Sequence, residues 1–224
     1  MLNKILFKQL IDFKIQSIID YNIFVEKNIK EGVSEIQSQY DDFLKMNPEI
    51  ENSTDEEYIE NFASVVDDLA FENKKLNQDI LYKHRQSIII HFYSLLEEEL
   101  FQFANLIQGN SQFKISDLKG NSTFDKFKLY LKKVDPDLLK SINNDLVYLD
   151  RIRLIRNFIV HHNSIIRDDN THFNKINDFK KGKFELRFKG ENKNGFKVFE
   201  IILNDSNFIN EIFKNYKSFI EKIY

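Results

Sequence analysis

The chain has 224 residues, 42% of them hydrophobic and 30% charged, and its formal net charge is −3. This composition indicates a globular protein with its own hydrophobic core and excludes a disordered chain. The absence of cysteine excludes disulfides, a thiolate nucleophile and cysteine-bound zinc, and the slightly negative charge excludes a globally basic nucleic-acid-binding protein.

The first 50 residues predict a long N-terminal helix. We expect it to run from about Leu2 to Lys30 and to end near Gly32, since glycine is common just after the last turn of a helix. Its apolar residues are interrupted by lysines and aspartates, a pattern that fits neither a signal peptide nor a membrane-spanning helix. We therefore expect a cytoplasmic protein that has no membrane partner.

The following segment predicts further long helices. A polar stretch at residues 47–53 indicates a loop, and Thr54 with Glu57 three residues later has the pattern of a capping box. Neither glycine nor proline occurs from there to Gly109, where we expect a helix to stop. One very long helix, or two helices broken between residues 72 and 77, would fit this segment.

The second half of the chain predicts shorter elements. A helix over residues 123–134 is followed by Asp135 as the cap, and Pro136 as the first turn, of a helix that extends to about His162. Residues 183–188 alternate between apolar and polar, and residues 196–203 are mostly apolar, which predicts two strands of a hairpin joined by residues 190–195. Asp205 or Ser206 would cap a final helix.

The predicted fold is therefore mainly α: a helical bundle with a small C-terminal β-hairpin and a final helix. We expect a single domain, residues 1–224. Its parts are an N-terminal extension (1–50), a helical core (54–162), the hairpin (183–203) and the final helix (205–224).

Arg156 falls near the centre of an apolar arc on the helix that ends at about His162. At about 100° per residue, the arc is formed by six side chains: Leu138, Ile142, Leu149, Ile152, Ile159 and Val160. A charged side chain there must be paired, line a cleft or lie in an interface, because an unpaired buried charge is too costly. One interpretation is thus a structural Arg156, paired with Glu97 or Glu98 of the middle helix.

The residues that follow Arg156 favour chemistry on a phosphate. Arginine offers a permanent, planar set of donors to a phosphate or a phosphorane. Asn157 can hold a phosphate oxygen, and His161 can take or give a proton, because imidazole side chains titrate near neutral pH. RNA carries its own nucleophile in the 2′-hydroxyl group, so this chemistry needs no metal or other cofactor.

The segment DRIRLIRNFIVHHNS, residues 150–164, resembles the Arg-x(4–6)-His signature of the HEPN superfamily, including the polar residue directly after the arginine. The preceding HRQSIIIHFYSLLEEELFQFANLI, residues 84–107, resembles the second long helix of HEPN domains from bacterial defence systems. The resemblance covers roughly Ile59 to His162 in architecture, and the short motif carries it.

The resemblance implies a metal-independent endoribonuclease that acts on RNA as a homodimer, with two motifs facing each other. Many relatives are toxins or act in abortive defence against phage, so an antitoxin or a defence-complex partner is a further expectation. By the same resemblance, Arg156 would stabilise the phosphorane, His161 would act as general acid or base, and Asn157 would orient the phosphate.

A dimer also makes chemical sense. In-line transesterification needs a base and an acid, and one motif supplies one obvious histidine. On an ideal helix Arg156 and His161 lie about 140° apart. They would converge only if the helix ends or kinks there, or if a partner chain completes the site.

Several other residues are candidates for binding RNA. His162 is the alternative to His161 and a candidate substrate contact. A basic stretch surrounds the first strand of the hairpin and could neutralise phosphates, although a solvated hairpin face would show the same pattern. Its candidate substrate-binding residues are Lys181, Lys183, Arg187 and Lys189.

A metal site at His84 and His91, seven residues apart on one helical face, is the less favoured interpretation, and His91 is expected to be a core residue or a support for the site. Two other functions compete with the ribonuclease. One is a HEPN-like subunit of a defence complex that binds RNA or protein without cleaving it. The other is a helical protein in which Arg156 is purely structural.

Overall fold

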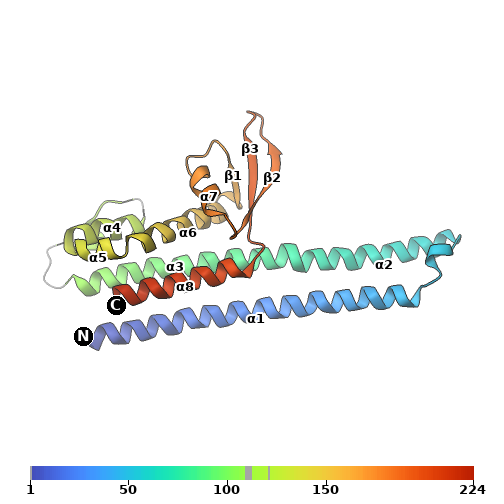
Figure 1. Ribbon diagram of the computed structural model, residues 1–224, viewed down its shortest axis with the longest axis horizontal. Helices are drawn as coiled ribbons and strands as arrows, with labels where there is room; N and C mark the ends of the chain where they lie inside the picture. Colours follow the sequence, from blue (N-terminus) through green and yellow to red (C-terminus); the bar gives the residue numbers. More distant parts are fainter. Residues whose placement is uncertain (1, 109–112, 121) are drawn as a thin grey trace. The chain divides into compact units, whose positions relative to one another are not determined.

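The computed structural model describes residues 2–108, 113–120 and 122–224. It is mainly helical, with a small antiparallel sheet and a C-terminal helix (Figure 1), which confirms the predicted fold class. The described chain forms two compact units, Asp20–His84 and the combination of Met1–Ile19 with Arg85–Tyr224. Both borders fall inside helices, and each unit is described by itself.

The unit Asp20–His84 is a helical hairpin. It contains most of α1 (Leu2–Met46), then η1 (Ile50–Asn52), α2 (Glu56–Lys74), the π-helical turn η2 (Lys75–Ile80) and the start of α3 (Leu81–Ile107). The rings of Phe43 and Phe62 stack with their centroids 5.0 Å apart, which joins α1 to α2.

Two boundaries predicted in this unit are wrong. α1 continues through Gly32, which does not end the helix and instead lies close to the Leu76 side chain, since a Cβ atom there would be 3.2 Å from Leu76 Cδ1. Asp55, not Thr54, caps α2 by accepting a hydrogen bond from the Tyr58 amide. No break separates α2 from α3, because the π-helical turn carries the backbone through residues 75–80. The stop expected at Gly109 lies outside the described residues.

In the second unit, the predicted caps are confirmed and one predicted helix is divided. Asp135 accepts a hydrogen bond from the Leu138 amide at the start of α5 (Pro136–Ser141), which follows α4 (Thr123–Val134). The chain breaks at Ile142 before α6 (Asn143–His162). The Ser141 hydroxyl donates to the Leu138 carbonyl at 2.8 Å, a bond that is known to bend helices.

The core of this unit lies around α3 and α8 (Ser206–Ile223), which run side by side, with α4, α5 and α6 on one side of them (Figure 1). Phe92 of α3 is 1% exposed, and its ring meets the rings of Phe213 and Tyr216 at centroid distances of 6.1 and 4.8 Å. Val160 was expected in the buried arc of α6 but is 40% exposed, whereas its neighbour Ile159 is 7% exposed, so the buried face of the last turn does not include Val160.

A three-stranded antiparallel sheet follows α6, in the order β1-β3-β2. It consists of β1 (Ile165–Arg167), β2 (Glu185–Glu191) and β3 (Lys197–Ile202), with the short α7 (Phe173–Phe179) between β1 and β2. The predicted hairpin is therefore present. β1 and α7 were not predicted, since three residues are too few to show the period of a strand.

Within residues 2–108, 113–120 and 122–224, no helix combines the length and the hydropathy that crossing a membrane requires.

Candidate functional site

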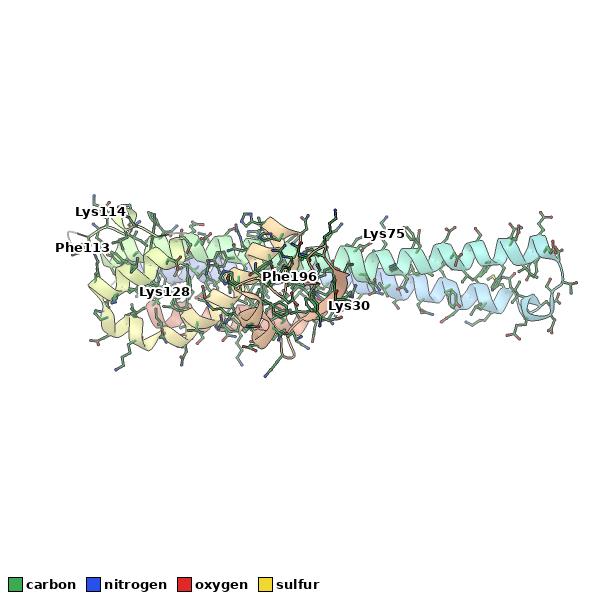
Figure 2. All side chains as sticks on the ribbon, turned by 90° about the horizontal axis from the view of Figure 1, so that it is seen from above. Lys30, Lys75, Phe113, Lys114, Lys128 and Phe196 are labelled. Carbon is green, nitrogen blue, oxygen red and sulfur yellow. The ribbon has the colours of Figure 1, made fainter. Side chains whose placement is uncertain are left out.

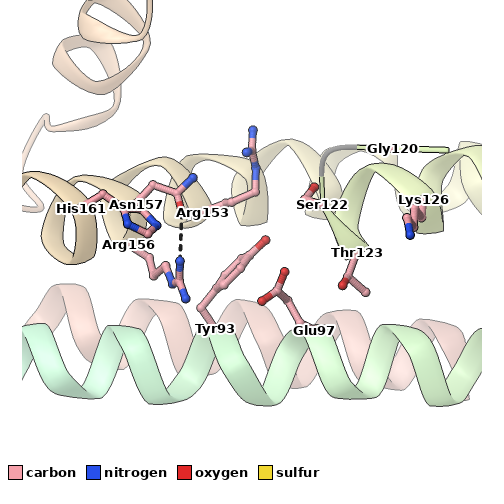
Figure 3. A pocket seen from close by; sticks show the side chains of 10 residues that line it. All are labelled: Tyr93, Glu97, Gly120, Ser122, Thr123, Lys126, Arg153, Arg156, Asn157 and His161. Atoms are coloured by element: carbon pink, nitrogen blue, oxygen red, sulfur yellow. Dashed lines mark hydrogen bonds between the residues drawn. The ribbon is translucent and has the colours of Figure 1, made fainter.

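A cavity of about 490 Å³ opens between α3, α4 and α6 in the larger unit (Figure 3). All three predicted catalytic residues line it, together with residues from two other helices. The lining residues are Tyr93, Glu97, Gly120, Ser122, Thr123, Lys126, Arg153, Arg156, Asn157 and His161.

Arg156 and His161 reach this cavity from one helix. Asn157 lies about 100° from Arg156 and about 40° from His161 around the axis, so the three form a continuous stripe along α6. The helix also ends one residue after His161, where Asn163 takes a left-handed backbone with φ 49°. Convergence of the motif on one cavity therefore occurs within a single chain.

Among the described residues, no ion pair holds the Arg156 guanidinium. Its Nη1 donates to Asn157 Oδ1 at 3.2 Å, and its Cζ lies 5.9 Å from the centre of the Tyr93 ring. Its Nε is buried and has no hydrogen-bond partner among the described residues. Glu98 pairs instead with Lys14 at 3.1 Å, and no salt bridge joins Arg156 to Glu97 in the described chain. The buried arginine–glutamate pair is thus not found among the described residues, and Arg156 lines the cavity without a carboxylate partner there.

The cavity carries more positive than negative charge. Lys126, Arg153 and Arg156 line it, whereas Glu97 is the one carboxylate among its described lining residues. Arg153 is anchored by Asp150, with Nη2 2.9 Å from Oδ1. Such an arrangement suits an anion that can accept several hydrogen bonds, as a phosphate does.

Five lining side chains were not predicted from the sequence: Tyr93, Ser122, Thr123, Lys126 and Arg153. Arg153 had a detectable signal, because Arg153, Asn157 and His161 recur every four residues and so share one face of a helix. The residues of α4 had none, since the approach of α4 to α6 depends on tertiary packing.

Glu97 and Tyr93, one turn apart on α3, form the floor of the cavity (Figure 3). Burial raises the pKa of the Glu97 carboxyl, against the lowering effects of Arg156 and Arg153. Burial also raises the pKa of the Tyr93 hydroxyl, and the charge of Glu97 adds to this effect. The tyrosine is therefore a neutral donor at ordinary pH.

The raised pKa of Glu97 gives a testable pH dependence. A carboxyl whose folded pKa exceeds its unfolded value contributes stability at low pH that is lost as the pH rises through the folded pKa. We expect Glu97→Gln to melt at a higher temperature than the parent above that pH and at the same temperature well below it. Melting curves from pH 4 to 8 measure this difference. A difference that is constant with pH would contradict the effect of burial on Glu97.

The other predicted substrate-binding residues lie elsewhere. None of them lines the cavity. His162 packs its ring against Phe158, with centroids 5.2 Å apart. Three of the hairpin bases form salt bridges with carboxylates. Lys183 pairs with Glu211, Arg187 with Glu185 at 4.0 Å and Lys189 with Glu200 at 3.2 Å. Lys181 is exposed. Neighbouring carboxylates therefore neutralise most of the positive charge of the basic stretch.

The structure also bears on the metal interpretation. His84 Nε2 lies 3.0 Å from Asn22 Oδ1, and the ring packs edge-on against Tyr21. His91 is exposed, so its expected place in the core is wrong. Among the described residues, no three histidine or carboxylate side chains cluster as metal ligands would.

No family model matches this chain, and no curated protein or solved structure is significantly similar to it. An assignment of function therefore depends on the chemistry of the cavity.

Proposed function

We propose that the chain is a metal-independent endoribonuclease of the HEPN type, acting in the cytoplasm as a toxin or as an effector of defence against phage. The observation that supports this best is the cavity itself: Arg156, Asn157 and His161 line it together, and its positive charge exceeds its negative charge. A guanidinium and a histidine that line one cavity suit the charge stabilisation and the proton transfer that RNA cleavage needs.

The reaction proposed is an attack of the 2′-hydroxyl oxygen on the adjacent phosphorus. The new O2′–P bond forms, the P–O5′ bond breaks, and Arg156 stabilises the extra negative charge of the phosphorane. His161 accepts the proton of the 2′-hydroxyl, and a second group protonates the departing O5′. Asn157 holds Arg156 through its amide oxygen, which leaves its amide nitrogen for a phosphate oxygen.

The second proton-transfer group is proposed to be His161 of another copy, across a homodimer axis. Glu97 is the alternative within the same chain, because it is the carboxyl that shares the cavity with His161. Light scattering distinguishes the two: a monomer that cleaves RNA at micromolar concentration would exclude the two-motif mechanism and favour Glu97.

The test of the proposed function is incubation of the purified protein with labelled tRNA and mRNA in excess EDTA. We expect cleavage to persist and to yield a cyclic phosphate on one fragment and a 5′-hydroxyl on the other, since the nucleophile belongs to the RNA. Substitution of 2′-deoxyribose at the cleaved position stops the reaction. Cleavage that requires Mg²⁺ or Mn²⁺ would indicate metal catalysis instead, and binding without cleavage would favour the non-catalytic subunit.

A further inference from the structure

We propose that the α4 side of the cavity is a second phosphate-binding subsite, formed by Lys126, the first turn of α4 and the Tyr93 hydroxyl. It takes the phosphodiester next to the one held by Arg156, so its ligand rests on the proposed function. Figure 3 shows Tyr93 and Glu97 between the α6 residues and the α4 residues. A cavity of about 490 Å³ has the size of a small-molecule site, larger than a single phosphate requires.

The Tyr93 hydroxyl is the observation that points to a ligand. Tyr93 is 2% exposed, yet it lines the cavity, and its hydroxyl has no hydrogen-bond partner among the described residues. A buried hydroxyl without a partner costs free energy, so a bound acceptor would recover that loss. Because its raised pKa keeps it neutral, it can donate to a phosphate oxygen.

The first turn of α4 supplies further donors. Ser122 caps the helix by accepting from the Asp125 amide at 3.1 Å. The amides of Thr123 and Phe124 have no partner inside the helix, and the positive end of the helix dipole lies with them. Helix starts of this kind are general binding sites for phosphate.

Lys126 adds a full positive charge to these donors. It lines the cavity and has no ion pair in the described part of the chain. Gly120 packs closely against it, since a Cβ atom there would lie 3.0 Å from Lys126 Cγ. A larger residue at position 120 would require the Lys126 side chain to shift by a few tenths of an ångström.

Two carboxylates, Asp125 and Glu97, lie near the proposed subsite, and neither prevents a phosphate from binding there. Asp125 accepts a hydrogen bond from the Ser122 hydroxyl at 2.8 Å and does not line the cavity. Glu97 does line it, and a phosphate bound beside it will favour its protonated form. The subsite should therefore bind phosphate more tightly at lower pH within the range where Glu97 titrates.

The test is a binding measurement that does not depend on cleavage. The probe is a fluorescein-labelled RNA oligonucleotide in which fluorine replaces every 2′-hydroxyl, so that it has several phosphodiesters but no nucleophile. We expect Lys126→Gln to weaken binding about tenfold and to reduce the salt slope by about 0.7, the value for one phosphate contact on a single strand. Tyr93→Phe should weaken binding several-fold without lowering the melting temperature, because it removes a hydroxyl that has no hydrogen-bond partner among the described residues.

The matched control is Lys128→Gln. Lys128 lies on the same helix (Figure 2). Its Nζ lies over the Phe124 ring, 4.4 Å from the ring centroid, and it does not line the cavity. Equal affinities for the Lys126 and Lys128 variants, or no effect of Tyr93→Phe, would overturn the subsite. If the parent also cleaves RNA, the proposed function survives that result. A clear Lys126 effect in a protein that never cleaves RNA would support the subsite and refute the ribonuclease.

Discussion

Arg156→Ala and His161→Ala should each reduce RNA cleavage by about two to four orders of magnitude, the scale of losing a transition-state donor or a general acid–base group. Both variants should melt close to the parent. Arg156 makes one hydrogen bond, to its neighbour Asn157, and no ion pair among the described residues. His161 is exposed. Neither truncation leaves a buried carboxylate that has lost a salt-bridge partner.

Two further measurements make this prediction sharp. The double variant should be scarcely less active than either single one, because residues that act as a unit have non-additive effects. His162→Ala is the matched control, since His162 packs on Phe158 outside the cavity, and it should retain near-parental activity. A large loss of stability in Arg156→Ala together with a fully active His161→Ala would refute the catalytic assignment.

Phe92→Ala should destabilise the larger unit by about 3–5 kcal/mol, the usual cost of removing a buried phenylalanine ring. The ring is 1% exposed and packs edge-on against Phe213 and Tyr216, so its loss opens a cavity between α3 and α8. At about 2–4 °C per kcal/mol for a chain of this size, the melting temperature should fall by about 6–20 °C.

Phe101→Ala provides the comparison on the same helix. Phe101 is 42% exposed, so its truncation should cost less than about 1 kcal/mol. Urea titrations of the two variants beside the parent measure both values. Similar losses for Phe92 and Phe101 would mean that α8 does not pack on α3 as described.

The sequence predicted elements whose signals are local. Asp135 with Pro136, and Asp205 at the last helix, mark helix starts by side-chain chemistry that acts within four residues, and both were found. The hairpin was found because its two strands differ in pattern from the helices around them. Gly32 misled the prediction, because the contact that explains it, Leu76, is far away in the sequence.

In the candidate site, too, the residues with a local sequence signal were predicted and those brought together by tertiary packing were not. Arg156, Asn157 and His161 form a compact motif on one helix, and all three line the cavity. Lys126 and Tyr93 come from other helices, and nothing in their local sequence indicates that they meet the motif.

The backbone hydrogen bonds that follow α6 should limit the opening of its last turn, which carries His161. After Asn163, the carbonyl of Ser164 accepts a hydrogen bond from the Ile201 amide at 2.8 Å, and β1 then pairs with β3. Helix ends ordinarily fray, but the end of α6 is followed within three residues by β1, which is hydrogen-bonded to β3. Amide hydrogen exchange in the last turn of α6 should therefore be slow and should follow the opening of β3. The pairing of β1 with β3 therefore holds the backbone that carries His161, whose side chain is itself exposed.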